Sequence, residues 1–453
     1  FNLLDKVLEL TEIHSCLMSI SDISIMHLKH GFQSLWSNEE RHSAVRRAAP
    51  KGVMPDKSRW RIGEALCLES TGKNNMKTTF RLGLAATGFL AASMMAPAAM
   101  AQEMPDTMVW TSYDVGSAGY AEASAIADAF GKKFGTRVRI QPSGSGIGRL
   151  QPLLQGRADY AFLATEAFFV SEGAFDFATP DWGPTELRAV AGRPAGITLI
   201  TAEDAGIRTV ADARGKRIAF VAGNPSVNVK CEAILAFGGL TLDDVEVITF
   251  PTYASAMASM TRNESDATCT TPTTSQLYEL AESPRGIFYV PLEADNAEGW
   301  EGLLKVLPIM GPSDEDVAAG LPEGEIAKMA AYRYPVITTT AGKSADEVYA
   351  FIKALDETYD LYKDGTATMK RWTLEQSGKP AIDVPFHEGA IRYLKEKGIW
   401  TAEDDAWNAK RTARMDALLA AWAEFKPANE GLSEEAFSEA WMAHRAEVVA
   451  ALN

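Results

Sequence analysis

Hydrophobic and polar positions between residues 107 and 340 follow two alternating periods. Short runs rich in β-branched and aromatic residues predict strands at 107–112, 137–141, 160–164, 197–201, 217–221, 246–250, 267–270, 287–290 and 335–340. Segments of helical spacing lie between them, at 121–130, 149–154, 228–237, 254–261 and 274–282. Strands that alternate with helices are typical of βα units on mostly parallel sheets, so we expect an α/β fold.

The same order of elements occurs twice along the chain. Each copy runs strand, loop of small polar residues, helix and strand, with the loop at 142–148 in the first copy and at 222–228 in the second. Two similar α/β lobes that face each other are the architecture of a hinged binding protein. We therefore expect lobe 1 to comprise residues 102–197 and 334–453, and lobe 2 to comprise residues 198–333.

Helical spacing dominates after residue 344. Residues 346–362, 401–424 and 433–452 carry apolar side chains three and four positions apart. The second of these segments has an apolar stripe of Met415, Leu418, Leu419 and Trp422, which is typical of core packing. We expect a helical tail that covers lobe 1 and braces the hinge.

Residues 76–101 have the three parts of a secretory signal. A short basic start is followed by an apolar stretch of Ala, Leu and Gly, and small residues stand at Ala99 and Ala101. The apolar stretch is shorter than the about 20 residues of a transmembrane helix. We therefore expect export to the periplasm and cleavage before Gln102. Residues 1–75 show no sustained pattern, and we interpret them as spurious upstream translation without ordered structure.

The charge balance excludes some classes of partner. The chain carries 44 basic and 60 acidic residues, a net charge of −16. Residues 1–101 contribute +3 of this, so the exported chain carries −19. So acidic a surface repels nucleic acids and anionic membranes, and we expect no nucleic-acid partner.

Few residues with thiol or imidazole chemistry remain after the signal. Cys231 and Cys269 form one disulfide or stay as two buried thiols, and the sequence leaves both readings open. With only His387 and His444, a histidine-based metal site or catalytic triad is hard to build. We expect no cofactor and no metal, although the composition leaves a carboxylate-only metal site open.

Four loops have the position of a ligand site. In open α/β sheets ligands bind at the carboxyl ends of strands, where helix N-termini favour anions. These loops are also compatible with ordinary βα turns, and Arg149 fits either a bidentate carboxylate clamp or a solvated helix position. Neither Gly-rich loop has the spacing of a phosphate or dinucleotide motif. The candidate ligand-binding residues are Ser117, Tyr120, Ser143, Ser145, Arg149, Asn224, Ser226, Asn228 and Thr271.

Several segments resemble one family of transport proteins. They are 116–120 (GSAGY), 156–162 (GRADYAF), 206–216 (GIRTVADARGK), 265–267 (SDA) and 385–393 (PFHEGAIRY). On these motifs the chain is similar to the TAXI group of TRAP transporter solute-binding proteins over nearly all of residues 102–453. The chain departs from the group's usual pattern at 164–165 and 225–229.

The resemblance implies a type II periplasmic-binding-protein fold of two lobes with a hinge and a helical C-terminal tail. It implies a monomeric receptor that closes on a small organic anion, a carboxylate or an amino acid, and delivers it to the membrane subunits of a TRAP transporter. Carried over by position, its ligand residues are Ser117, Tyr120, Ser145, Thr165, Asn224, Tyr253 and Thr271, whereas His387 of the last motif is read as structural.

Two other functions remain open from the sequence. A binding protein of the same fold also serves ABC transporters or sensor kinases, because the lobes alone do not name the recipient. A periplasmic enzyme would need a general base beside a poised nucleophile. Asp114 and Glu166 are the candidate bases, and no motif supplies either with a partner, so we expect binding without catalysis.

Overall fold

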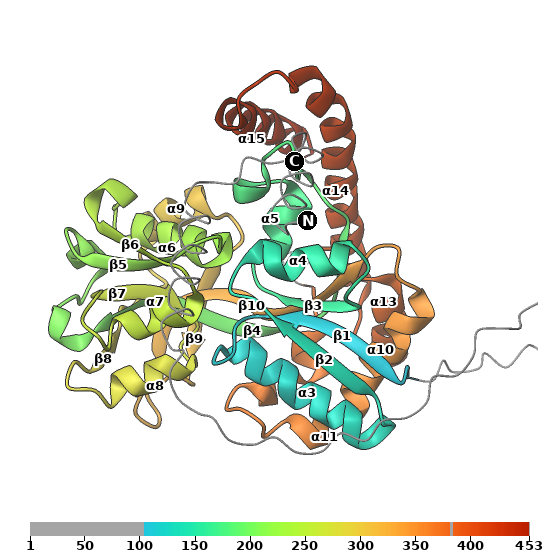
Figure 1. The fold of residues 1–453 in the computed structure, drawn as a ribbon, viewed down its shortest axis with the longest axis horizontal. Helices are drawn as coiled ribbons and strands as arrows, with labels where there is room; N and C mark the ends of the chain where they lie inside the picture. Colours follow the sequence, from blue (N-terminus) through green and yellow to red (C-terminus); the bar gives the residue numbers. More distant parts are fainter. Residues whose placement is uncertain (1–103, 381–383, 453) are drawn as a thin grey trace, which may run out of the picture. The chain divides into compact units, whose positions relative to one another are not determined.

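The computed structural model describes residues 104–380 and 384–452, so the expected signal and residues 1–75 lie outside the described residues. The strands follow one path in the order β2-β1-β3-β10-β4-β7-β5-β6, with β8 paired to β4 and β9 to β10 (Figure 1). The strands are β1 (Thr107–Ser112), β2 (Arg137–Pro142), β3 (Tyr160–Leu163), β4 (Leu187–Ala202), β5 (Arg217–Val221), β6 (Glu246–Phe250), β7 (Ala267–Thr270), β8 (Ile287–Tyr289), β9 (Gly311–Glu315) and β10 (Ala327–Thr340).

The helices fall largely where their spacing predicts them. They are α3 (Ala118–Phe134), α4 (Gly146–Leu154), α5 (Glu166–Glu172), α6 (Pro225–Phe237), α7 (Tyr253–Ser259), α8 (Ser275–Ala281), α9 (Ala297–Val306), α10 (Ala345–Glu357), α11 (Tyr359–Tyr362), α12 (Leu374–Ser377), α13 (Glu388–Glu396), α14 (Ala402–Asn429) and α15 (Glu434–Ala450). In lobe 1, α4 and α5 lie on one face of the sheet, and α3 and α11 lie on the other (Figure 1).

The long strands β4 and β10 connect the two α/β halves. They pair antiparallel with each other as far as Ile197. From Thr198 onward, β4 pairs instead with β7, which belongs to the second half. We call the part built on β2, β1 and β3 lobe 1, and the part built on β7, β5 and β6 lobe 2. Each lobe is an α/β unit with parallel strands, and two crossing strands join the lobes. This arrangement confirms the expected type II two-lobed fold.

The sequence underestimated both crossing strands. Residues 187–196 of β4 and 327–334 of β10 show no clear alternation, because most of their side chains are buried whichever face they point to. Pro194 and Pro335 also interrupt the pattern. The short strand β9 was missed altogether, because its residues GPSDE have low strand propensity and it forms by pairing with β10.

Aromatic side chains fill the core of lobe 1. Trp110 of β1 is fully buried and contacts three rings: Phe130 of α3, Phe162 of β3 and Phe351 of α10, with ring centroids 5.3–5.7 Å apart. Phe351 comes from the far C-terminal part of the sequence. The helical tail is therefore part of the same hydrophobic core as the first strand.

Lobe 2 contains a disulfide, so the sequence's other interpretation, two separate buried thiols, is wrong. Cys231 of α6 and Cys269 of β7 are bonded, with Cα atoms 5.2 Å apart. Both residues are buried. The bond joins the helix and the strand that lie side by side next to the interface between the lobes.

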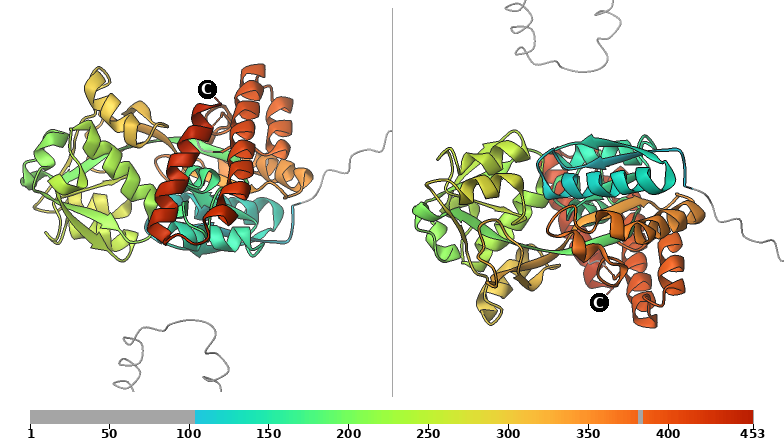
Figure 2. Two further views of the ribbon diagram at one scale, coloured as in Figure 1. Left: turned by 90° about the horizontal axis from the view of Figure 1, so that it is seen from above. Right: turned by 90° about the horizontal axis from the view of Figure 1, so that it is seen from below.

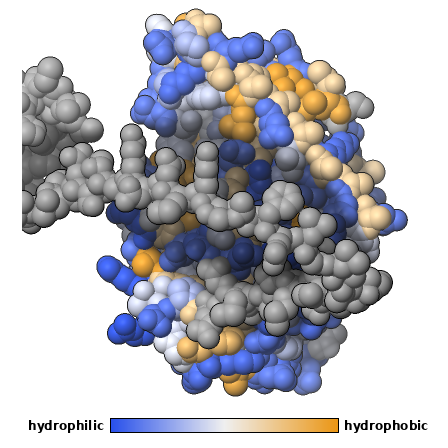
Figure 3. All heavy atoms as spheres, turned by 90° about the vertical axis from the view of Figure 1, so that its right-hand side faces the viewer, coloured by the Kyte–Doolittle hydropathy of each residue, from blue (hydrophilic) through white to orange (hydrophobic). Residues whose placement is uncertain are grey.

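The helical tail lies over lobe 1, as expected. The view from above shows α14 and α15 across lobe 1 (Figure 2). Trp441 of α15 is buried and donates a hydrogen bond from Nε1 to the carbonyl of Gly173, which follows α5 (2.7 Å). Where Figure 3 shows the described residues, many are hydrophilic, and apolar residues form a band toward the top, at the height of α14 and α15 in Figure 1.

The motif around His387 anchors α13. The segment runs beside β4, with hydrogen bonds from Ala189 N to Pro385 O and from His387 N to Ala189 O (both 2.8 Å). The imidazole caps α13: Nδ1 accepts from Gly389 N (3.1 Å), and Nε2 lies 3.0 Å from Lys343 O. These contacts give His387 a structural role.

None of the helices that the structure describes combines the length and apolar character needed to cross a membrane.

The disulfide gives a first prediction. The double variant Cys231→Ala/Cys269→Ala should lose about 2–4 kcal/mol of unfolding free energy, because the cross-link restricts the unfolded chain. Urea unfolding of a protein comprising residues 102–453 measures this loss. Dithiothreitol should produce a similar loss in the wild type and no further loss in the variant; a wild type that is equally stable with and without the reductant contradicts the prediction.

His387 gives a second prediction. Burial lowers the pKa of its imidazole below the ordinary value, against the opposing effect of its contact with the Lys343 carbonyl. Below pH about 6.5 the imidazole therefore binds more protons in the unfolded chain than in the folded chain. The free energy of unfolding consequently decreases as the pH is lowered. Between pH 7 and 5.5, above the range of most carboxyl groups, His387→Asn should lose less unfolding free energy than the wild type. Equal losses in urea unfolding would exclude this contribution.

Candidate functional site

Loops and helix starts of the two lobes contact each other directly. Asn224 at the start of α6 donates from Nδ2 to the carbonyl of Gly144 in lobe 1 (2.9 Å). Ser275 at the start of α8 donates from Oγ to the carbonyl of Gly116 (2.6 Å). The carboxyl ends of the strands of both lobes therefore face each other, and the lobes are closed.

Between these contacts lies a small buried chamber. Its volume is about 10 Å³, roughly the space of one water molecule. Entry of a solute therefore requires the lobes to move apart. The lining residues are Tyr113, Ala164, Ile197, Val227, Lys230, Tyr253, Thr270, Thr271, Tyr332 and Tyr334.

Lys230 is the one charged residue among these lining side chains. It lies on α6, one turn after Ser226, and is almost fully buried. Its Nζ donates to Ser226 Oγ (3.1 Å) and to Thr165 Oγ1 (3.4 Å), and it lies 4.0 Å from the centroid of the Tyr332 ring. Thr165 belongs to lobe 1, so the lysine bridges the lobes.

Hydroxyl groups surround the rest of the chamber. The Tyr253 hydroxyl shares hydrogen bonds with Thr270 Oγ1 (2.5 Å) and Thr274 Oγ1 (2.7 Å), and the Tyr332 hydroxyl shares one with Thr271 Oγ1 (2.7 Å). Burial raises the pKa of both tyrosines, so they stay neutral and able to donate. The chamber thus combines an ammonium group with several neutral hydroxyl donors.

Arg149 neither lines this chamber nor faces solvent. Its Nε and Nη2 donate to Glu166 Oε1 (2.9 and 2.7 Å), and its Nη1 donates to Ser143 O (2.7 Å). The guanidinium lies 3.4 Å from the centroid of the Tyr113 ring. Burial acts to raise the pKa of Glu166, but the Arg149 charge and hydrogen bonds outweigh it and lower the pKa. Arg149 therefore pairs with a carboxylate of the protein itself, and the interpretation of Arg149 as a solvated helix residue is wrong because its side chain is fully buried.

Three other predicted residues cap helices. Ser117, Ser145 and Asn224 each accept a hydrogen bond from the backbone N–H three residues further on (3.1, 3.0 and 3.2 Å). Such N-caps satisfy the free donors of a helix end. Their side-chain oxygens serve the loops, and none of the three lines the chamber.

The remaining predicted residues divide into two groups. Asn228 turns its amide toward β5, where Nδ2 and Oδ1 bond the carbonyl and N–H of Val221 (2.9 and 3.0 Å). Ser143 Oγ lies close to Ser145, and half-buried Tyr120 is not a lining residue. Tyr253 and Thr271 line the chamber, and Thr165 and Ser226 contact Lys230.

The sequence analysis missed Lys230, Tyr332 and Tyr334. Lys230 stands four residues after Ser226, which places both on one helix face, and this spacing was a usable signal. Tyr332 and Tyr334 lie two apart on β10 and so share one face of the strand. They escaped notice because this half of β10 has no strand pattern.

A close approach explains one glycine of the GSAGY motif. The hydroxyl of Tyr334 accepts a hydrogen bond from Gly119 N (3.2 Å). A Cβ atom on residue 119 would lie 2.6 Å from that oxygen, where no side chain fits without displacing the tyrosine. Gly119 of the motif thus leaves room for the Tyr334 hydroxyl, which comes from the crossing strand β10 and lines the chamber.

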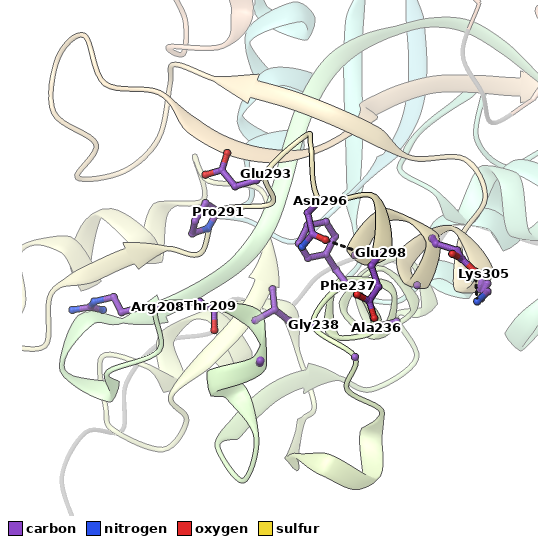
Figure 4. A pocket seen from close by; sticks show the side chains of 16 residues that line it. Arg208, Thr209, Ala236, Phe237, Gly238, Pro291, Glu293, Asn296, Glu298 and Lys305 are labelled. Carbon is purple, nitrogen blue, oxygen red and sulfur yellow. Dashed lines mark hydrogen bonds and ion pairs between the residues drawn. The ribbon is translucent and has the colours of Figure 1, made fainter.

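A larger hollow of about 690 Å³ lies on lobe 2 (Figure 4). It is formed by the end of α6, the 3-10 helix Val210–Ala213 and α9, all within one lobe. Its charges are mixed: Arg208, Lys305 and three glutamates line it, and Lys305 pairs with Glu301 (2.7 Å). It lacks the buried polar groups from two lobes that the chamber has.

Across residues 104–380 and 384–452, no group of three or more His, Cys, Asp or Glu side chains is placed to hold a metal ion.

The two crossing strands and the chamber between α/β lobes define the fold class of the type II periplasmic binding proteins. The model of the NMT1-like family matches residues 114–398, more than half of the chain. The chain belongs to the NMT1-like family.

Solved structures of similar fold include three binding proteins. The alkanesulfonate-binding protein SsuA from Xanthomonas axonopodis pv. citri, bound to MOPS, is 15% identical with a TM-score of 0.36, over 68% of this chain and 84% of that chain. The periplasmic aliphatic sulphonate binding protein SsuA from Escherichia coli is 16% identical with a TM-score of 0.34, over the same shares. An ancestral arginine-binding protein bound to arginine is 14% identical with a TM-score of 0.36, over 59% of this chain and 99% of that chain.

The buried ion pair gives a third prediction. Arg149→Met should cost about 3–5 kcal/mol of unfolding free energy, because it leaves the Glu166 carboxylate buried without its partner. Arg149→Met/Glu166→Gln should recover part of this loss. Arg157→Met, at an exposed arginine, should change stability by less than about 0.5 kcal/mol. Urea unfolding compares the four proteins; similar stabilities of the two single variants would show that the pair is not buried as described.

Proposed function

We propose that the chain is an exported receptor that captures a small organic anion between its two lobes and delivers it to a membrane transporter. The observation that carries this proposal is the chamber itself. Among its lining residues Lys230 carries the charge, and tyrosine and threonine hydroxyls line the chamber with it. An ammonium group with several hydroxyl donors suits the oxygens of a carboxylate, because hydrogen bonds to a charged acceptor are the strong ones.

The closed interface supports binding by lobe movement. Both β4 and β10 pass between the lobes, and the chamber is enclosed by residues of both. Separation of the lobes would break few contacts, such as those of Asn224 with Gly144 and of Lys230 with Thr165. Closure around a solute would bring the lobes together again, as in other hinged binding proteins.

The recipient of the solute is proposed from the sequence motifs. The GSAGY and PFHEGAIRY segments resemble the TAXI group, which implies delivery to a TRAP transporter in the periplasm. In the structure these segments hold Tyr334 against Gly119 and anchor α13 beside β4. An ABC transporter or a sensor kinase remains the alternative recipient, because the chamber chemistry is independent of the partner.

We propose binding without turnover. Among the residues that line the chamber, none is a serine, cysteine or histidine. Glu166, a candidate general base from the sequence, is held by Arg149 and carries a lowered pKa. A carboxylate so stabilised in its charged form is a poor base.

The fourth prediction tests Lys230. Small carboxylates such as lactate, pyruvate, succinate, glutamate and 2-oxoglutarate, screened against the exported chain, should include at least one that raises its melting temperature. Lys230→Met should weaken that solute by about 1.5–3 kcal/mol, the range for hydrogen bonds to charged groups. This corresponds to roughly tenfold to 150-fold in the dissociation constant measured by calorimetry.

Lys305→Met is the matched control, because Lys305 is exposed on α9 and outside the chamber. It should bind the solute as the wild type does. Equal affinities of the two lysine variants would place the carboxylate elsewhere. Steady conversion of any solute in the screen would replace the receptor by an enzyme.

A further inference from the structure

The wall of the chamber carries charge of one sign. Lys230 is charged, and none of the residues that line the chamber is an aspartate or a glutamate. The other polar side chains of the lining are tyrosines and threonines. A solute with an ammonium group beside its carboxylate would therefore bring a second cation to this wall. It would have to find its anionic partner behind the lining residues.

Glu166 lies behind the lining, and its charge reaches the chamber residues Tyr113 and Tyr332. Its carboxylate is already fully engaged. Oε1 accepts from Nε and Nη2 of Arg149 (2.9 and 2.7 Å). Oε2 accepts from the Tyr113 hydroxyl (3.2 Å) and from Ala164 N (3.0 Å). A carboxylate offers about four acceptor sites, so Glu166 has none left for an ammonium group.

Asp114 is a second acidic residue near the chamber, where its charge reaches Tyr253. It is half-buried and does not belong to the lining. Its Oδ2 lies against Gly144 of lobe 1, so closely that a Cβ atom on residue 144 would be 2.6 Å away. An ammonium group inside the closed chamber would thus lack a carboxylate partner, and a buried cation without one is strongly unfavourable.

Hydrogen-bond donors of the lining are in excess. The Tyr334 hydroxyl accepts from Gly119 N (3.2 Å), and its own proton has no acceptor among the residues that the structure describes. The hydroxyls of Tyr332 and Thr271 share one hydrogen bond (2.7 Å), which uses one of their two protons. Tyr334 and Tyr332 are buried. Buried donors without an acceptor are unfavourable, so a solute rich in acceptor oxygens would stabilise the closed chamber.

We propose that the solute of the chamber is a carboxylic acid without an ammonium group, and that the Tyr334 hydroxyl donates a hydrogen bond to one of its oxygens. This inference rests on the proposed function and names the class of solute for the same site. Of the two classes that the sequence motifs imply, carboxylates and amino acids, it selects the first. The physical reason is that the lining supplies a cation and hydroxyl donors but no anion.

Three pairs of compounds that share a carbon skeleton test the proposal: pyruvate and L-alanine, succinate and L-aspartate, and 2-oxoglutarate and L-glutamate. Isothermal titration of a protein comprising residues 102–453 should show binding of at least one of the three acids. Its amino-acid counterpart should bind about tenfold or more weakly, because the ammonium group finds no partner. An amino acid that binds as tightly as its paired acid, or more tightly, overturns the inference and leaves the receptor function in place. Absence of binding by all six compounds counts against the receptor function as well.

Tyr334→Phe tests the proposed donor. The variant keeps the ring that stacks on Tyr332 (centroids 5.9 Å apart) and removes the hydroxyl. It should weaken the bound acid by about tenfold or more, as expected for a hydrogen bond to a charged group. Tyr278→Phe is the matched control, because Tyr278 is exposed on α8 and outside the lining, and it should bind as the wild type does.

Melting temperatures without solute show whether both tyrosine variants are folded. Equal affinities of the two folded variants would overturn the role of Tyr334. The comparison of acids with amino acids uses the wild type, so it tests the class of solute even where Tyr334→Phe is unstable.

Discussion

The antiparallel pairing of β4 with β10 is the constraint on which the rest of the molecule depends. Each strand is long enough to belong to both lobes, and β4 exchanges β10 for β7 as a partner between Ile197 and Thr198. The pair sets how the two sheets face each other. It also carries Tyr332 and Tyr334 to the floor of the chamber, so the connection between the lobes is part of the site.

Two buried cations near the chamber have different roles. Arg149 is held by a carboxylate, a carbonyl and an aromatic ring, all within lobe 1, and it orders the wall formed by Tyr113. Lys230 meets neutral hydroxyls of both lobes and lines the chamber. The charge of Lys230 also helps to lower the pKa of the buried Glu166 carboxylate. The two cations differ in position: Lys230 lines the chamber and Arg149 does not, so the proposed anion contact is assigned to Lys230.

The helical tail contributes more than cover. Phe351 enters the core of lobe 1 beside Trp110, and the arginines of α14 and α15 surround Glu172. The first contact ties the C-terminal part of the sequence to the first strand. The second fixes α14 and α15 to the end of α5.

The sequence by itself determined the α/β class, the two lobes and most elements: β1, β5, β6 and β7 begin and end where their patterns predict. These strands are short and bounded by turns, so local propensity and burial agree. It also placed the loops that meet across the lobes. Only the tertiary structure decided which side chains of those loops reach the chamber. Capping turned Ser117 and Asn224 toward their own helices, Glu166 captured Arg149, and the unpatterned half of β10 supplied two tyrosines. Such outcomes depend on partners distant in the sequence, which local patterns do not contain.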